Sequence, residues 1–247
     1  MRGGLVVLTA ALVAAPGVAH AGRTFYGWLY GSEVMPERGA ELQSWITELN
    51  FEDRVETNWL FGAQVGVTDQ LELGFPLEID WSRDTDPVTG AVTSVSTRFA
   101  RFGMEARYRF VTQDPEDAPA LAPLLRVGVK RLILDRDAVQ PEADFVISYE
   151  SGVVQVLADL GFVAQVGPDV QEFQFRPGAG VSVLAVDDLR FGAEVLAELR
   201  SEGKSWVIAG PNVSWTHGRF WISGVFGIGL IQDRIKTAPR VQWGIAF

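Results

Sequence analysis

Hydrophobic and polar residues alternate along most of this chain. In residues 189–200 (LRFGAEVLAELR), the odd-numbered positions are apolar and the even-numbered positions include Arg190 and Glu194. The same period of two recurs in 71–81 and in 170–186. Successive side chains of a strand point to opposite faces, whereas a helix would scatter these residues around its axis. The pattern therefore predicts β-strands, each with one apolar face.

Applied to the whole chain, this pattern predicts about twelve strands. They cover residues 40–51, 54–67, 70–82, 97–112, 119–134, 142–150, 152–166, 170–186, 189–201, 204–217, 219–233 and 237–247. In an alternative with ten strands, 40–51 and 142–150 are loops. Tight turns are expected at one end of the strands, at Thr68-Asp69, Ser151-Gly152, Asp187-Asp188 and His217-Gly218. Longer connections, 83–96 and 134–143, are expected at the other end, and an even strand count places both termini on the periplasmic side.

The distribution of hydrophobicity favours a closed membrane barrel over a soluble fold. Mean hydropathy is +0.12 although 21% of the residues are charged, and beyond residue 21 no apolar run is long enough for a transmembrane helix. In a soluble sandwich or lipocalin-like barrel the apolar residues face inward, and 15 Phe and 8 Trp would overfill a small core. We therefore expect an all-β, antiparallel transmembrane β-barrel with its apolar faces toward lipid.

The first 21 residues are typical of a signal peptide. Arg2 supplies a positive charge, 5–15 is an apolar core too short to span a bilayer, and Ala19 and Ala21 suit a signal peptidase. The mature chain would begin near Gly22, and a retained N-terminal anchor is the alternative. The sequence contains no Cys, which excludes a lipoprotein anchor, disulfides and thiolate metal sites.

The last eight residues, RVQWGIAF, form an alternating strand that ends on an aromatic residue. Trp243, Ile245 and Phe247 fall on one face, and small or polar residues lie between them. This end resembles the closing strand of bacterial outer-membrane barrels. The resemblance implies that these three residues are an assembly signal that the barrel-assembly machinery recognises, and that the chain resides in the outer membrane of a Gram-negative bacterium.

Two segments near the start of the chain resemble a known class of barrels. They are 24–47 (TFYGWLYGSEVMPERGAELQSWIT) and 66–81 (GVTDQLELGFPLEIDW). They look like the porin-like outer-membrane transporters found beside pathways that degrade aromatic compounds. The resemblance implies a passive channel for small solutes, with small hydrophobic or aromatic compounds among them, and no catalytic residue. The alternative is a closed barrel with a structural or interaction role in the outer membrane.

Charged residues on the inward face are the candidate functional residues. They are Glu72, Glu78, Asp80, Arg101, Glu105, Arg107, Arg109, Arg126, Lys130, Asp159, Arg176, Arg190, Glu194, Glu198 and Arg200. Rows of opposite sign could line an open pore that selects small polar or anionic solutes. They could equally form ion pairs that fill a closed interior. Inward glycines such as Gly178 and Gly180 favour the open channel, because they leave the wall thin.

Little in the sequence supports catalysis, cofactor binding or nucleic-acid binding. The net charge is −10, which disfavours nucleic acid. His217 is the only histidine beyond the leader, and Arg219 stands where the outer-membrane phospholipase pattern would have Ser, so we expect no enzyme. We also expect no cofactor and no bound metal.

An acidic outer loop is the remaining candidate for ion binding. It holds Asp135, Asp137, Glu142 and Asp144, which could bind Ca²⁺ or join the divalent-ion layer of lipopolysaccharide. It lacks the Gly and the terminal Glu of a calcium loop, so a solvated loop is the stronger interpretation.

The chain thus divides into a signal peptide (1–21), an N-terminal extension (22–39) and an outer-membrane barrel (40–247). The extension could be an extra strand, a periplasmic extension or a plug. As a plug, it would place Tyr26, Trp28 and Tyr30 in the pore. The expected partners are membrane lipid and lipopolysaccharide, the assembly machinery and a small-molecule solute, with no particular oligomeric state indicated.

Overall fold

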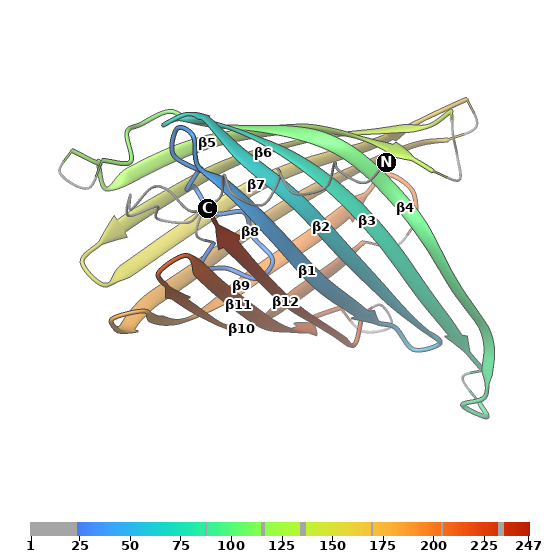
Figure 1. The fold of residues 1–247 in the computed structure, drawn as a ribbon. Coiled ribbons are helices and arrows are strands. Elements are labelled where there is room, and N and C mark those ends of the chain that lie inside the picture. Colours follow the sequence, from blue (N-terminus) through green and yellow to red (C-terminus); the bar gives the residue numbers. More distant parts are fainter. Residues whose placement is uncertain are drawn as a thin grey trace, which may run out of the picture.

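The protein is a closed antiparallel barrel of twelve strands (Figure 1). The computed structural model describes residues 24–86, 88–114, 117–133, 137–168, 170–203, 205–231 and 235–247. The expected leader and Asp135 lie outside these residues. The strands are β1 Ala40–Asn50, β2 Arg54–Thr68, β3 Leu71–Thr85, β4 Val92–Arg109, β5 Leu121–Leu132, β6 Val139–Ser151, β7 Val154–Val166, β8 Gln171–Val186, β9 Leu189–Arg200, β10 Trp206–His217, β11 Phe220–Gly229 and β12 Thr237–Ala246. The prediction of a twelve-strand barrel is confirmed, and the ten-strand alternative is wrong.

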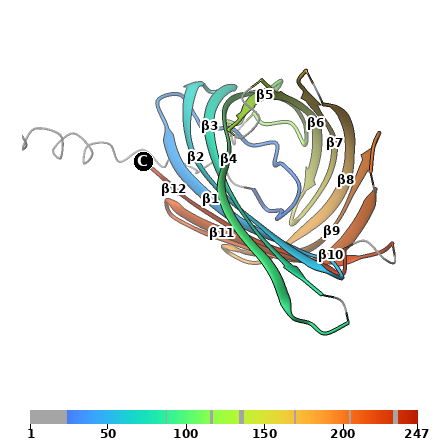
Figure 2. The same cartoon turned by 90° about the vertical axis from the view of Figure 1, so that its right-hand side faces the viewer.

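Each strand pairs with its sequence neighbours, and β1 pairs with β12 to close the ring (Figure 2). In the closing pair, Leu42 lies opposite Ile245 and Trp45 lies opposite Gln242. Closure leaves no open sheet edge along the wall, so the backbone hydrogen bonds of the barrel are satisfied within it.

The alternation of the sequence separates an apolar outer face from a polar inner face. On β3, Phe75 and Leu77 are exposed on the outside, whereas Glu72 and Glu78 are buried inside. Ile245 and Phe247, at the end of the chain, belong to the exposed outer face. Among the described residues, no helix is long and apolar enough to cross a membrane.

The two mouths of the barrel differ in their connections. At the proximal mouth, where β1 begins and β12 ends, two-residue turns follow β2, β6, β8 and β10, and a longer connection follows β4. The distal mouth carries the other connections. Two expected loops there are shorter than the sequence suggested. Because β3 and β4 continue past the barrel as a hairpin, residues 83–96 are mostly strand (Figure 1).

The second shortened loop corrects the interpretation of the acidic outer loop. β6 begins at Val139, so Glu142 and Asp144 are strand residues, buried on the inner face. They therefore belong to the lumen and not to a solvated loop. The sequence contained the signal, because Ala143, Phe145 and Ile147 continue the outward apolar row.

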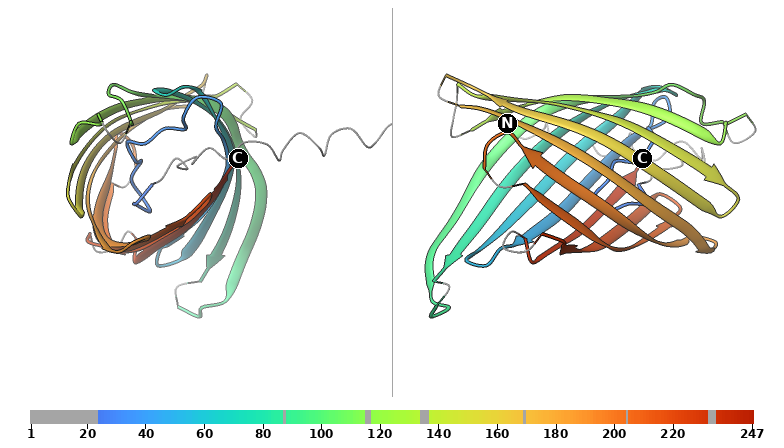
Figure 3. Two further views of the ribbon diagram at one scale, coloured as in Figure 1. Left: turned by 60° about the vertical axis from the view of Figure 1, so that its left-hand side comes forward. Right: turned by 180° about the vertical axis from the view of Figure 1, so that it is seen from behind.

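Residues 24–39, which we call the inner segment, form a loop whose greater part lies inside the barrel (Figure 3). The segment has no helix or strand and forms a loop that enters the lumen and returns to the proximal mouth, where it joins β1. Tyr26, Leu29 and Val34 are at most 3% exposed and pack against an apolar stripe of the wall that includes Leu157 and Ile208.

Candidate functional site in the barrel lumen

A large group of luminal charges is centred on Arg126 of β5. Arg126 is only 2% exposed, and its guanidinium lies 2.6 Å from Glu105, 2.8 Å from Glu142 and 2.6 Å from Asp144. Glu105 comes from β4, and the other two carboxylates come from β6. A buried charge requires such partners, because removing it from water is costly. The group therefore ties three adjacent strands together inside the barrel.

The ion-pair network continues toward the distal mouth through Lys130. Its ammonium lies 2.8 Å from Glu78 Oε1 and 2.8 Å from Glu142 Oε1, and Arg101 lies 2.7 Å from Glu78 Oε2. Asp80, one step further along β3, accepts a hydrogen bond of 2.7 Å from an asparagine of β2. Acidic residues of β3 thus face basic residues of β4 and β5 across the sheet.

A second group of charges lies farther around the distal lumen, on β8 and β9, with β7 between it and β6. Glu198 is its centre, with Arg176 at 2.8 Å and Arg200 at 2.5 Å. Arg200 also lies 3.5 Å from Glu172, and Trp206 Nε1 donates a hydrogen bond of 3.1 Å to Glu198. Both groups satisfy their charges within the wall.

A third set of luminal charges binds the inner segment. The carboxylate of Glu194, on β9, accepts hydrogen bonds from three consecutive backbone N–H groups, those of Gly27 (2.5 Å), Trp28 (2.7 Å) and Leu29 (3.2 Å). Asn212 Nδ2 donates a fourth at 2.8 Å. Hydrogen bonds to a charged group are stronger than neutral ones, so Glu194 is the main polar anchor of the segment's tip.

Other wall residues bind backbone groups farther along the segment. Carboxylates and one glutamine accept hydrogen bonds from the N–H groups of the segment. Arginines and the same glutamine donate hydrogen bonds to its carbonyl groups. The contacts are Asp159 with Tyr30 N (3.3 Å), Arg107 with Gly31 O (2.8 Å), Arg109 with Ser32 O (2.9 Å), Gln113 with both Val34 N and Val34 O (3.0 Å each), and Glu72 with Met35 N (2.7 Å). The segment is therefore held along its whole length.

Three aromatic rings of the inner segment lie against wall arginines. The guanidinium-to-ring distances are 4.2 Å for Arg190 and Phe25, 4.1 Å for Arg240 and Trp28, and 4.3 Å for Arg126 and Tyr30. A cation over a ring face is attracted by the ring quadrupole, more strongly where water is excluded. These pairs add a second type of contact between segment and wall.

Burial changes the ionisation of the segment's own titratable groups. It raises the pKa of Tyr30 to about 12, although Arg126 lies against the ring, so the phenol stays neutral near pH 7. Burial also raises the pKa of Glu33 above its ordinary value of 4.5, because the cost of removing the charge from water exceeds the attraction of Arg109 and Arg107.

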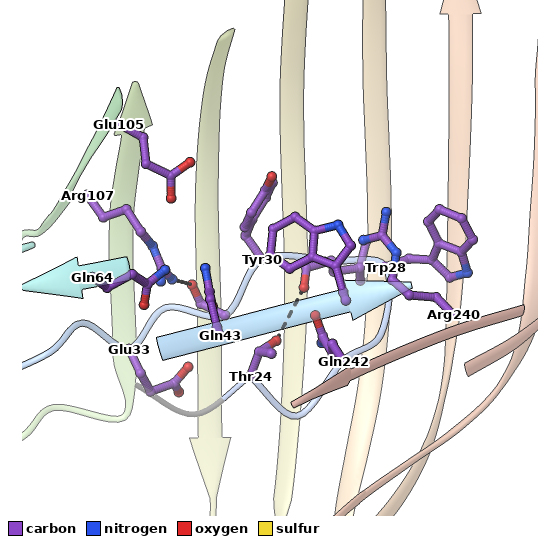
Figure 4. Close-up of a pocket in the computed structure, with 13 residues that line it drawn as sticks. Thr24, Trp28, Tyr30, Glu33, Gln43, Gln64, Glu105, Arg107, Arg240 and Gln242 are labelled. Carbon is purple, nitrogen blue, oxygen red and sulfur yellow. Dashed lines mark hydrogen bonds between the residues drawn. The ribbon is translucent and has the colours of Figure 1, made fainter. Parts of the chain in front are cut away.

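Two cavities lie beside the inner segment, a small one at its tip and a wider one at the proximal mouth. A cavity of about 30 Å³ remains between the tip and β1, β2 and β12, with Trp28 and Arg240 on one side and Arg107 on the other (Figure 4). Such a volume accommodates about two water molecules. A wider cavity of about 450 Å³ opens at the proximal mouth, lined by Arg109 and Arg190 among others.

The glycines that suggested a thin wall make room for side chains. A Cβ on Gly178 would lie 2.3 Å from Leu29 Cδ2, and a Cβ on Gly180 would lie 2.5 Å from Tyr26 Cε1. The space left by these glycines is filled by the inner segment. They therefore do not widen a pore, contrary to the expectation from the sequence.

The structure places all fifteen candidate charges on the inner face. Eleven are buried, and Asp80, Arg101, Arg176 and Arg200, toward the distal mouth, are more exposed. The candidates do not form one site, because they divide between wall ion pairs and contacts to the inner segment. Sequence reasoning did not include several luminal residues, namely Glu33, Glu41, Gln113, Arg240 and Gln242.

His217 lies at a turn of the proximal mouth. Its Nδ1 is 2.8 Å from Asp188 Oδ2, its ring stacks on Trp215, and 72% of its side chain is exposed. Within the described parts of the chain, no group of three or more His, Asp or Glu side chains is arranged to hold a metal ion.

Neither a protein-family model nor a curated protein sequence matches this chain. Solved structures are similar in fold. The KdgM porin in complex with disordered oligogalacturonate has a TM-score of 0.54 at 9% identity, over 85% of this chain and 99% of that chain. The NanC porin has a TM-score of 0.54 at 8% identity, over 83% and 98%. The translocator domain of autotransporter NalP from Neisseria meningitidis has a TM-score of 0.52 at 12% identity, over 85% and 88%. The chain therefore shares its β-barrel fold with these structures.

Proposed function

We propose that the chain is an outer-membrane channel for small solutes and that the inner segment closes its lumen from the periplasmic side. The observation that carries the proposal is the matched contact between wall charges and the segment. Glu194, Asp159 and Arg109 are among the wall charges that contact the segment. Other wall charges, such as Lys130, Glu142 and Glu198, pair with charges of the wall itself. The wall is thus built around an occupant that side-chain contacts hold in place within the lumen.

The attachment of the segment suits a reversible closure. Where it leaves the lumen, two backbone hydrogen bonds fix its base to β2, from Arg38 N to Gly66 O (3.1 Å) and from Gly66 N to Gly39 O (2.8 Å). Deeper in the lumen the wall holds it through side chains. Release of those contacts would free the lumen while the base stays attached to the barrel.

The proposed location rests on both ends of the chain and on the outer surface. The leader-like residues 1–21 and the final residues Trp243, Ile245 and Phe247 support export and recognition by the barrel-assembly machinery. Exposed apolar side chains cover the outside of the barrel and suit contact with lipid and lipopolysaccharide. In this orientation the proximal mouth faces the periplasm.

The polarity of the lumen also indicates which type of solute the channel would take. The family resemblance suggests small hydrophobic or aromatic compounds. Charged and hydrogen-bonding groups line most of the lumen, which favours polar solutes.

Conductance of a deletion variant tests the proposed channel. We expect the whole chain in a planar bilayer to be closed most of the time, and a variant lacking residues 24–36 to show ohmic openings, because the lumen then loses its occupant. Migration on a gel with and without boiling verifies that the variant is folded. A folded deletion variant without conductance would contradict the channel.

That outcome would favour a second candidate, a closed barrel with a structural role. The bonds of Arg126 to three carboxylates of neighbouring strands support this alternative. Such a network fills the interior and stabilises the wall whether or not the segment is present.

A further inference from the structure

The wall recognises the inner segment mainly by its backbone. Between Tyr26 and Met35, most peptide groups meet a wall side chain of matching polarity. Gln113 is the clearest case, because its side-chain amide accepts a hydrogen bond from the N–H of Val34 and donates another to the carbonyl of Val34. Gln242 and Arg240 likewise donate to the carbonyls of the segment's first turn.

Glu194 is specialised for peptide N–H groups. Its described partners are three consecutive backbone amides and one asparagine amide, and it is 4% exposed. A buried carboxylate without a cationic partner depends on such donors. If the segment leaves, the carboxylate loses three of its four hydrogen bonds, and another peptide chain can restore them.

The side chains of the segment are recognised less specifically. Leu29 and Tyr26 occupy space that Gly178 and Gly180 leave open, and the rings of the segment lie on flat guanidinium faces. Neither contact requires one particular side chain. Main-chain hydrogen bonds give affinity, and shallow pockets give a modest preference, which is the pattern of peptide sites that accept many sequences.

We propose that the luminal wall around the inner segment is a binding site for oligopeptides that bend as residues 27–29 do, and that the segment occupies this site in their absence. The inference rests on the proposed channel and names its solute class. The segment would then leave the lumen in exchange for a peptide that takes over its backbone contacts.

The arrangement of charges distinguishes peptides from other polar solutes. Anions would meet Glu194, Asp159 and Glu72, which repel them where the segment's N–H groups now lie. A neutral sugar carries hydroxyls but no fixed order of donors and acceptors. A peptide with the same bend presents N–H groups to the carboxylates and carbonyls to Arg107 and Arg109, as the segment does.

A thiol placed in the segment reports the exchange in the full chain. The chain has no Cys, and Ser32 is 1% exposed, so Ser32→Cys reacts with a thiol reagent only when the segment leaves the wall. The probe is the capped tetrapeptide Gly-Trp-Leu-Tyr, the sequence of residues 27–30, at about 5 mM, near the millimolar effective concentration of a short tether. Controls are the same peptide N-methylated at Trp and Leu, which lacks two of the three N–H groups that donate to Glu194, and a neutral tetrasaccharide.

We expect the tetrapeptide to raise the labelling rate about threefold, since it competes with the segment at a comparable effective concentration. The N-methylated peptide and the sugar should have no effect. The response should persist in Glu198→Gln and disappear in Glu194→Gln. An equal response to the sugar or to the N-methylated peptide, or no response to the tetrapeptide, would overturn the proposal.

Swelling of proteoliposomes separates this inference from the channel itself. Faster swelling in the tetrapeptide than in the tetrasaccharide supports both the channel and the peptide site. Equal swelling in the two solutes keeps the channel and refutes the peptide class. Absence of swelling together with a specific labelling response refutes the channel and keeps the peptide site.

Discussion

Replacing Glu194 by Gln should release the inner segment without unfolding the barrel. The carboxylate accepts three backbone hydrogen bonds from the segment, at 2.5, 2.7 and 3.2 Å. Glutamine keeps one acceptor oxygen and points its NH₂ group at the remaining N–H donors. At least one charge-assisted bond is therefore lost and another is weakened.

The size of the effect follows from those bonds. A hydrogen bond to a charged group contributes about 1.5–3 kcal/mol. Loss of one and weakening of a second should cost the docked state about 2–4 kcal/mol, which raises the ratio of undocked to docked molecules by a factor of about 30 to 1,000.

Thiol labelling of Ser32→Cys measures that ratio in the folded protein. The matched control is Glu198→Gln, on the same strand and equally buried, whose described partners are wall residues and not the segment. A second control thiol, Ser94→Cys on the exposed hairpin, corrects for reagent reactivity. Equal labelling rates in the Glu194 and Glu198 variants would refute the role given to Glu194.

Three further predictions concern packing, pH and assembly. Gly178→Val should speed labelling of Ser32→Cys at least as much as Glu194→Gln does, because its side chain takes the space of Leu29, and an unchanged rate would contradict the packing. The pKa of Glu33 is raised when the segment is docked, so docking is favoured below pH 4.5 and weakens as pH rises through the raised value. The labelling rate of Ser32→Cys, corrected for thiol ionisation, should therefore increase with pH, and this increase should be absent when Glu33→Gln is added. The same pH dependence with and without Glu33→Gln would contradict the role of Glu33. Deletion of Phe247 should lower the amount of protein in the outer membrane while export continues, and normal membrane levels on fractionation would remove the support for an assembly signal.

The strand pattern could be predicted because lipid and lumen impose opposite polarity on successive residues. The ends of the strands could be predicted less well, because apolar and polar residues do not alternate where both faces of a strand have the same environment. Residues 83–96 continue as a hairpin beyond the wall, where both faces are polar enough to resemble a loop. Glu142 and Asp144 resembled a solvated loop because their buried partner, Arg126, is remote in sequence.

The inner segment could not be placed from sequence for a different reason. Its backbone supplies most of its polar contacts, and backbone groups leave no pattern in the sequence. Trp28 and Tyr30 were noted as candidates for the pore, but the arginines that meet them, Arg240 and Arg126, lie 212 and 96 residues away in the sequence. Sequence patterns identified which residues point inward, and the contacts of the loop determined which of them act together.

The closure of the lumen by the inner segment can be tested with a reversible covalent lock. Ser32 Oγ and Ser148 Oγ lie 2.5 Å apart, close to the length of a disulfide bond of about 2.05 Å, so Cys at both positions should join the segment to β6. The measurement is planar-bilayer conductance of this double variant before and after addition of reductant. We expect no openings while the disulfide is intact and openings after its reduction. Equal conductance in the two states, or silence in both, would contradict the account of a channel closed by its own N-terminal segment.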